Sequence, residues 1–240
     1  MHNFPKYIED CSTQNVLKLD TLLDSGMPWL KLNIDVPDFE DTVFETAVAQ
    51  STDWRSQWAS SSKYANIDSN LVKEWNGQLL FGPSDWDAWL DIYLNTKGSD
   101  EDEMCKRFRN ELEFSWRLDE HHPIRQFVES VFPDPLDINI VNFYVLPPGG
   151  FLFPHTDPSI GNKSLNKLYI PLRWAEGNEF GFYGWGNMPV QQGNVYLINN
   201  YRYAHWVLNR SNEPRVVLDI GSNLKSIKQT IIDSFHANNS

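Results

Sequence analysis

A histidine and an aspartate stand two positions apart in the stretch GGFLFPHTDPSIG (149–161). Phe153 and Asp157 each precede a proline, which restricts both residues to extended backbone. Residues two apart in an extended chain point to the same side, so His155 and Asp157 can reach one ion. A chain with six His and 32 Asp and Glu contains about one such triplet by chance. The pair therefore indicates a metal site only together with its context.

A metal site needs a third ligand, because two donors hold an ion poorly. His205 begins the segment HWVLN (205–209), which a returning antiparallel strand can place beside His155. Two histidines and one carboxylate on one face of an octahedral ion leave positions open, an arrangement typical of non-haem Fe(II) oxygenases. Taken alone, His205 is better explained as a hydrogen-bonded core histidine. Joined to the His-x-Asp pair, it is better explained as a ligand.

An arginine ten positions after His205 indicates an anion site. Arg215 opens the apolar segment RVVLDI (215–220). A guanidinium inside an apolar barrel is costly without an anionic partner, and it binds a carboxylate through two hydrogen bonds. We interpret Arg215 as a clamp for the distal carboxylate of a dicarboxylate cosubstrate. The alternative is a surface arginine paired with Glu213 or Asp219.

The second half of the chain must supply the elements that position these residues. From residue 138 onward, short apolar segments alternate with turns rich in Gly, Pro and Asn, which predicts strands. Many short strands without intervening helices favour antiparallel pairing, as a sandwich, barrel or jelly roll. The expected strands are 138–146, 166–174, 179–184, 194–199, 205–209 and 215–220, followed by a helix over 223–235 that packs back on the body.

The first half of the chain has a different pattern. Its periodicity is mostly helical, so we expect a largely helical region over 1–133 packed on a strand-rich core over 134–240, as one compact unit. Residues 51–70 are rich in Ser and contain two Trp, and we interpret them as a long loop that can lie over the site. The expected helices are 84–95, 104–116 and 122–132.

The site residues and their order resemble a known superfamily, the Fe(II)- and 2-oxoglutarate-dependent oxygenases. Within it, the segments PHTDP, LYIPL and GNVYLINNYRYAHWVLNRSNEPRVVLDI are most similar to the aspartyl/asparaginyl β-hydroxylase group, which also contains certain proline hydroxylases. The resemblance covers about residues 138–221. It implies an α+β fold whose core is a double-stranded β-helix, a cupin-like jelly roll.

The resemblance also implies a cofactor, a cosubstrate and a reaction. His155, Asp157 and His205 would bind Fe(II). Arg215 would bind the C5 carboxylate of 2-oxoglutarate. The implied reaction consumes O2 and 2-oxoglutarate, hydroxylates an unactivated C–H bond, and releases succinate and carbon dioxide. The substrate class would be an amino acid, a peptide side chain or a small metabolite.

Five further residues are candidates for contacts with the cosubstrate or the substrate. In the group, the strand that matches NKLYIPL often carries a basic residue and a histidine near the cosubstrate; the matching residues here are Lys167 and Tyr169. Tyr169 departs from that pattern, because a phenol donates a hydrogen bond without a charge. Arg173 and Arg202 could receive a substrate carboxylate, and Trp206 could wall the cavity. Solvated arginines and a core tryptophan are the plainer alternatives.

Composition limits the partners. With 20 Lys and Arg against 32 Asp and Glu, the formal charge is −12, which disfavours nucleic acid and anionic membrane partners. No signal segment or membrane span is recognisable, so we expect a cytoplasmic protein, and Cys11 and Cys105 are expected to be free thiols. Two other functions stay open: a cupin-type metal enzyme that does not use 2-oxoglutarate, and a catalytically silent binding module.

Overall fold

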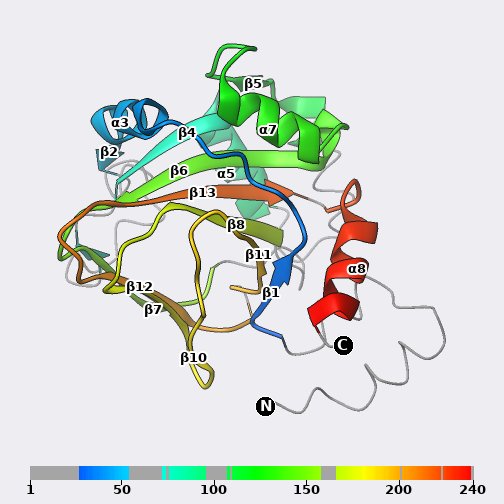
Figure 1. Cartoon of the computed structure of the whole chain (residues 1–240). Helices are drawn as coiled ribbons and strands as arrows, with labels where there is room; N and C mark the ends of the chain where they lie inside the picture. Colours follow the sequence, from blue (N-terminus) through cyan, green and yellow to red (C-terminus); the bar gives the residue numbers. More distant parts are fainter. Residues whose placement is uncertain are drawn as a thin grey trace.

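Two sheets of antiparallel strands face each other in the computed structural model of this chain (Figure 1). The larger sheet has the order β1 (Trp29–Leu32), β11 (Val195–Ile198), β8 (Asn166–Arg173), β13 (Arg215–Ser222), β6 (Ile138–Leu146), β4 (Asn76–Pro83) and β2 (Thr52–Asp53), with β5 (Phe114–Trp116) paired to β4. The smaller sheet has the order β10 (Gly186–Asn187), β9 (Asn178–Phe182), β12 (His205–Asn209), β7 (Phe151–His155) and β3 (Val72–Lys73). The structure describes residues 27–53, 72–73, 76–95, 107–108, 110–157, 166–200, 202–222 and 224–238.

From β6 onward the chain alternates between the two sheets. Strands β6, β8, β11 and β13 belong to the larger sheet, whereas β7, β9, β10 and β12 belong to the smaller one. This winding is that of a double-stranded β-helix, so the predicted jelly-roll core is confirmed. Strands β6 and β12 have the predicted bounds, and the other four predicted strands differ by one or two residues at one or both ends.

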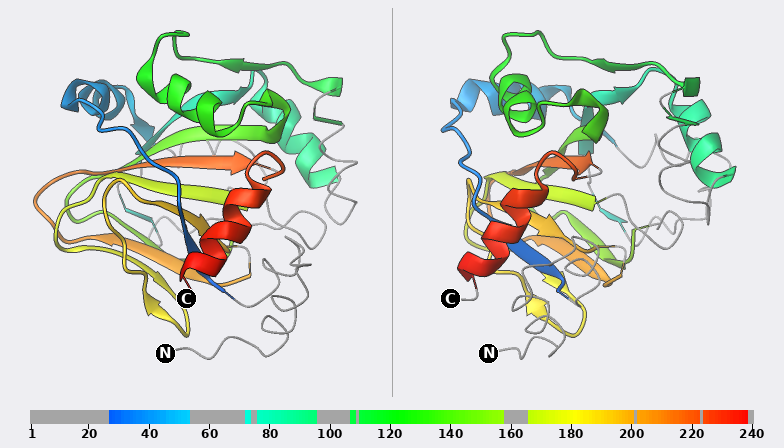
Figure 2. Two further views of the ribbon diagram at one scale, coloured as in Figure 1. Left: turned by 45° about the vertical axis from the view of Figure 1, so that its right-hand side comes forward. Right: turned by 90° about the vertical axis from the view of Figure 1, so that its right-hand side faces the viewer.

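Helices cover the side of the larger sheet that faces away from the smaller sheet. Helices α3 (Asp41–Gln50) and α7 (Pro123–Val131) lie over this outer face, and α8 (Lys228–Asn238) packs beside β1 (Figures 1 and 2). Helix α7 begins as predicted with Pro123 in its first turn, where the missing N–H costs nothing. The ring of His122 caps it by accepting the N–H of Ile124 at 3.2 Å. The helix predicted over 84–95 is α5 (Trp86–Asn95).

Buried apolar side chains form two clusters, one on each face of the larger sheet. The outer cluster lies between this sheet and the helices, and it includes Ile124, Phe127, Val128, Leu218, Ile220, Ile231 and Phe235. The inner cluster lies between the two sheets, and it includes Leu152, Tyr169, Phe180, Phe182, Val207 and Val217. The outer cluster holds the helices, and the inner cluster holds the two sheets together.

The expectation of a largely helical first half missed several strands. Strands β1 and β4 are hydrogen-bonded into the larger sheet, where β4 pairs with β6 from Asn76 to Phe81. The helix predicted over 104–116 is wrong at its end, because 114–116 form β5. The last helix begins at Lys228, five residues later than predicted, because Leu224 has a φ of 61°. Of the loop predicted over 51–70, residues 52 and 53 form β2, and the residues after 53 lie outside the described part of the chain.

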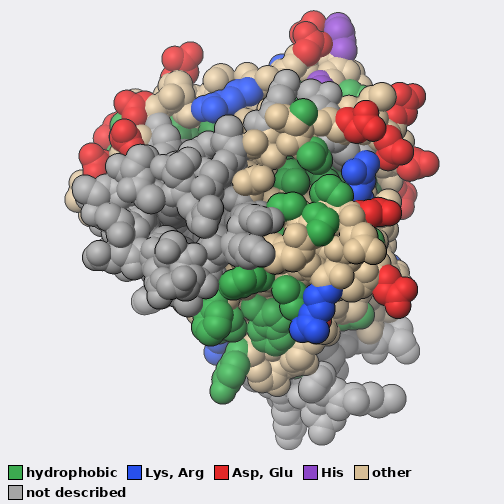
Figure 3. Space-filling model, turned by 90° about the vertical axis from the view of Figure 1, so that its left-hand side faces the viewer, with side chains coloured by type: hydrophobic (Ala, Val, Ile, Leu, Met, Phe, Trp, Pro, Cys, Tyr) green, Lys and Arg blue, Asp and Glu red, His purple; other side chains and the backbone are tan. Residues whose placement is uncertain are grey.

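The surface carries the charge expected from the composition. Asp and Glu side chains gather along the edges of the face in Figure 3, and hydrophobic side chains form patches between them. In the part of the chain that the structure describes, no helix has the length and apolar character needed to cross a membrane. Cys11 and Cys105 lie outside the described residues.

Candidate metal centre

A β-bulge in β7 turns His155 toward the space between the sheets. In the pairing of β7 with β12, His205 lies opposite His155 and Val207 lies opposite Leu152, so β7 carries one extra residue in this interval. Leu152 belongs to the inner cluster. In a regular strand Pro154 would share its face, but the extra residue brings His155 inward instead. A proline fits this bulge, because it has no N–H to give to the ladder.

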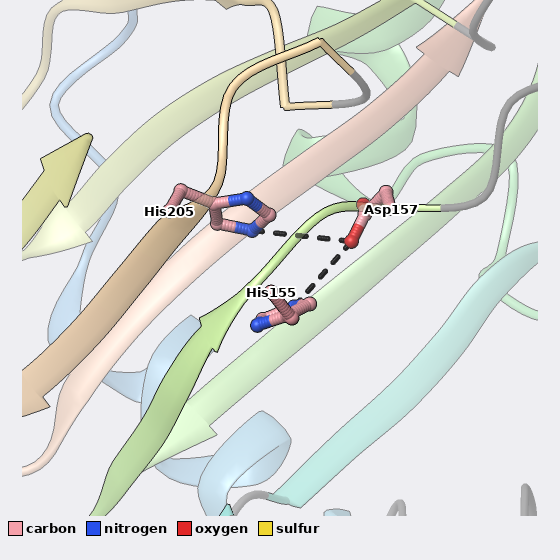
Figure 4. A group of neighbouring side chains, drawn as sticks. All are labelled: His155, Asp157 and His205. Atoms are coloured by element: carbon pink, nitrogen blue, oxygen red, sulfur yellow. Dashed lines mark ion pairs between the residues drawn. The ribbon is translucent and has the colours of Figure 1, made fainter. Parts of the chain in front are cut away.

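The three candidate ligands meet at one end of the β7–β12 pair (Figure 4). Oδ1 of Asp157 lies 3.4 Å from Nε2 of His155 and 3.9 Å from Nε2 of His205. The two imidazole rings are 4.4 Å apart, and one ligand atom from each of the three residues lies within 4.8 Å of the others. Donors that share an octahedral ion at about 2.1 Å lie about 3 Å apart. A small movement of the side chains closes the set around one ion.

The surroundings of the two imidazoles decide which ring nitrogen faces the site and how readily each ring takes up a proton. Nδ1 of His155 lies 2.7 Å from the Phe153 carbonyl oxygen and donates to it, so Nε2 is the nitrogen that faces Asp157 and can bind an ion once it has lost its proton. Burial lowers the pKa of His155, but the hydrogen bond and the charge of Asp157 outweigh burial and raise it. Burial lowers the pKa of His205 to about 4, so His205 is neutral at physiological pH.

The two oxygens of the Asp157 carboxylate have different partners. Oδ2 accepts hydrogen bonds from Nζ of Lys167 at 2.7 Å and from Nδ2 of Asn200 at 2.6 Å. Oδ1 faces the two histidines. The backbone N–H of Asp157 also donates to the Asn200 carbonyl oxygen at 2.9 Å. Burial raises the pKa of Asp157, but Lys167 and the histidines hold it well below its usual range, so the carboxylate is ionised.

Arg215 is a buried cation at the first residue of β13. Its side chain is 5% exposed, and the guanidinium carbon lies 5.0 Å from the ring of Trp174 and 5.6 Å from the ring of Tyr169. One terminal nitrogen donates to the Glu179 carbonyl oxygen at 3.4 Å, and Nε has no partner. Among the described residues, no carboxylate pairs with this guanidinium, neither Glu213 nor Asp219. A buried unpaired guanidinium fits an anionic ligand.

A continuous run of aromatic rings connects Arg215 to the metal ligands. The ring of Phe180 lies 5.6 Å from His205 and 4.7 Å from Tyr169, whose ring lies under the guanidinium. Two further polar atoms on the inner face of the larger sheet, Oδ1 of Asn142 and Oδ1 of Asp219, are buried without a hydrogen-bond partner. Orphaned polar atoms in an apolar interior are typical of a site that receives a polar ligand.

The structure places the three residues predicted to contact the substrate as follows. Trp206 follows His205 on β12 and points to the opposite face, where its indole covers Gly181 so closely that an added Cβ would overlap it. Arg173 pairs with the exposed Asp41 of α3 at 3.4 Å. Arg202 is an exposed residue of the turn between β11 and β12. Lys167, predicted near the cosubstrate, binds the carboxylate of Asp157.

Asn200 was missed as a site residue, and the residue type of Phe180 alone does not single it out. Asn200 stands in the turn segment INNYRY, where an asparagine is typical of a turn, so its type carries no signal for a ligand contact. Phe180 is one of 14 Phe in an aromatic-rich chain. The alternation EFGF does place residues 180 and 182 on one face, but only the fold shows which face is inside.

Solved structures with a similar fold include three prolyl hydroxylases. The viral collagen prolyl hydroxylase of Paramecium bursaria Chlorella virus-1, in its 2-oxoglutarate complex, is 12% identical; the match covers 81% of this chain and 95% of that chain, with a TM-score of 0.41. The Pseudomonas putida prolyl-4-hydroxylase is 13% identical over 85% of this chain and 97% of that chain, with a TM-score of 0.39. The Trichoplax adhaerens prolyl hydroxylase, in complex with a hypoxia-inducible-factor peptide, is 8% identical over 99% and 98%, with a TM-score of 0.40. These similarities are too distant to indicate a function.

The family is established from the sequence. No curated protein matches the chain. A family model described as aspartyl/asparaginyl β-hydroxylase matches residues 45–221, which is more than half of the chain. The match begins well before residue 138, so it includes strands of the first half that carry no motif recognisable by eye. The chain therefore belongs to the aspartyl/asparaginyl β-hydroxylase family.

Proposed function

We propose that this protein is an Fe(II)- and 2-oxoglutarate-dependent dioxygenase. Its reaction would hydroxylate an unactivated C–H bond of an amino acid, a peptide side chain or a small metabolite. One observation carries the proposal: two histidines and a carboxylate meet in the same interior as a buried guanidinium that has no carboxylate partner among the described residues. A cupin-type enzyme without 2-oxoglutarate, or a silent binding module, would leave this guanidinium unexplained.

The donor set fits Fe(II). His155 and His205 would offer one nitrogen each, and Asp157 would offer Oδ1. Three donors on one side leave positions for other ligands, whereas a structural zinc site would be closed by four donors. When bound, Fe(II) with 2-oxoglutarate and O2 supplies the oxidant for the C–H bond, and succinate and carbon dioxide are released. The ionised state of Asp157 and the neutral state of His205 are the forms that bind a cation.

The interior fits a dicarboxylate. Arg215 would bind the distal carboxylate through charge-assisted hydrogen bonds. Burial raises the pKa of Tyr169 despite the nearby Arg215, so its hydroxyl keeps its proton and can donate to the same anion. Phe180, which is 2% exposed, and the other rings of the inner cluster exclude water from the path between the two sites. Exclusion of water strengthens both the ion pair and the metal coordination.

The test is formation of succinate from 2-oxoglutarate in the presence of Fe(II) and O2, followed by NMR with a panel of amino acids and peptides. We expect succinate with the native sequence, and none with Asp157→Ala. Arg215→Leu should produce little, and Arg210→Leu, which changes an arginine that is 67% exposed, should match the native sequence. Tight metal binding without any succinate or any effect of 2-oxoglutarate would favour the cupin-type alternative.

A further inference from the structure

The Asp157 carboxylate is held by two donors that are not metal ligands. Lys167 and Asn200 both bind Oδ2, and both histidines face Oδ1. Lys167 and Asp157 are each 21% exposed, so bulk water competes weakly for this contact. Asn200 binds the residue twice, through its side-chain amide and through its backbone carbonyl. The orientation of the carboxylate is therefore fixed before an ion arrives.

The larger sheet also fixes Lys167. Its backbone lies in β8 between Ile198 of β11 and Gly221 of β13, in the middle of the sheet. Its side chain faces the space between the sheets, on the same face as Tyr169 and Asp219 two residues along the strands. The negative charge of Asp219 attracts the ammonium group as well. A lysine between two carboxylates on a central strand has little freedom to turn toward another ligand.

We propose that Lys167, assisted by Asn200, is a positioning residue of the metal centre that keeps Asp157 a one-oxygen ligand. This inference rests on the proposed function. An octahedral ion with three single-atom protein donors has three positions left, enough for a keto acid that chelates through two atoms and for dioxygen. If both oxygens of Asp157 bound the ion, one of those positions would be lost. Lys167 and Asn200 prevent this by occupying Oδ2.

The test uses Co(II) as a spectroscopic substitute for Fe(II), in the full chain and without 2-oxoglutarate. Lys167→Met keeps an unbranched apolar stem, one atom shorter than lysine, and removes the charge and the donors. We expect Co(II) affinity to fall about 10- to 100-fold, as is usual when a partner of a ligand is lost. We also expect the visible d–d absorption to change, because the carboxylate becomes free to bind through both oxygens. Lys167→Arg, which keeps the charge and the donors, should restore affinity to within about fivefold and restore the native spectrum.

Lys228→Met is the matched control, because it makes the same change at an exposed helix residue. Its Co(II) affinity and spectrum should equal those of the native chain. If Lys167→Met does not fold, Asn200→Ala removes the other donor to Oδ2 and should lower Co(II) affinity about tenfold with a similar spectral change. An Asn200→Ala protein that folds and binds Co(II) with native affinity and spectrum would then overturn the inference.

The results separate this inference from the proposed function. Native Co(II) affinity and spectrum in Lys167→Met, with weaker binding of 2-oxoglutarate, would make Lys167 a cosubstrate contact and overturn the positioning role. A native chain that binds Co(II) but never 2-oxoglutarate would contradict the proposed function. In that case the spectral change in Lys167→Met would still show that this residue orients the ligand carboxylate.

Discussion

The two faces of β13, in the larger sheet, are equally buried but differ in chemistry. All eight residues of β13 are buried. On the outer face, Val216, Leu218 and Ile220 pack in the outer cluster against helices. On the inner face, Arg215 and Asp219 flank Val217, and each carries a polar atom without a hydrogen-bond partner among the described residues. One strand therefore contributes to stability on one side and, in the proposed function, to ligand binding on the other.

The difference shows which face of the strand loses stability because it carries polar residues. An apolar face gains free energy from burial at every residue. A face with a guanidinium that lacks a carboxylate partner and one orphaned carboxylate oxygen loses part of that gain, because buried polar atoms without partners are destabilising. Buried polar residues without hydrogen-bond partners are expected at functional sites. Substitutions on the outer face should therefore change stability alone, and substitutions on the inner face should change binding.

The largest effect is expected at the metal ligands. His155→Ala removes a donor whose side chain is 39% exposed, so little packing is lost. We expect the affinity for Fe(II) or Co(II) to fall about 1,000-fold or more, about 4 kcal/mol, while the free energy of unfolding of the metal-free protein changes by less than about 1 kcal/mol. His121→Ala, at a histidine that is 82% exposed, is the control. Equal metal affinity in both variants would show that His155 is not a metal ligand.

On the outer face, Leu218→Ala should lower stability and leave metal affinity unchanged, the opposite of His155→Ala. Leu218 is fully buried in the outer cluster, so truncation leaves a cavity and lowers the free energy of unfolding by about 3 kcal/mol. Denaturant unfolding measures this loss, and metal titration of the folded variant should give the native affinity. A large fall in metal affinity here would show that the two faces are coupled.

Arg215→Leu should weaken the binding of 2-oxoglutarate and stabilise the free protein. Loss of the charge-assisted contact should lower affinity for 2-oxoglutarate about 50-fold, about 2 kcal/mol, by titration of the metal-loaded protein. Without 2-oxoglutarate the variant should unfold at a higher temperature, because a buried unpaired charge has been replaced by an apolar side chain. Arg210→Leu should change neither quantity. A destabilised variant with native affinity would mean that Arg215 serves packing.

Asp219→Asn should give a pH-dependent gain in stability of about 2–3 kcal/mol in metal-free protein. Burial raises the pKa of Asp219 from 3.8 to about 6, against the attraction of Lys167. The folded state therefore holds this proton more tightly than the unfolded chain, and that stabilisation is complete below pH 4 and lost as the pH rises through 6. The free energy of unfolding, measured with a chemical denaturant, should be higher for the variant than for the native protein at pH 8 and equal for the two near pH 4. A difference independent of pH would contradict this.

Local sequence predicts the core strands well, but it does not show which other segments pair with them. Strands β6 and β12 are apolar runs between turn residues, and their bounds were predicted from those turns. The segment of β4, NGQLLFGP, contains Gly and Pro that are typical of turns. It is a strand because β6, about 60 residues later, pairs with it. Such non-local pairing leaves no mark in the sequence of either strand.

The same limit applies to the site. The sequence predicted that His155, Asp157 and His205 belong together, and the structure brings them together. The bulge that turns His155 inward depends on the register with β12, which no local rule gives. Trp206 was chosen because it adjoins His205, although neighbours in a strand point to opposite faces. For Lys167, the resemblance indicated the strand, and the fold shows its contact with Asp157.

In the proposed function, this interior binds Fe(II) and 2-oxoglutarate together. Anaerobic titration of the Fe(II)-loaded protein with 2-oxoglutarate tests it most directly, because a keto acid that chelates iron gives a weak visible charge-transfer band. We expect the band in the native protein, its loss in His205→Ala, and its appearance only at higher 2-oxoglutarate concentration in Arg215→Leu. Iron bound in full, with no band at saturating 2-oxoglutarate, would contradict the account.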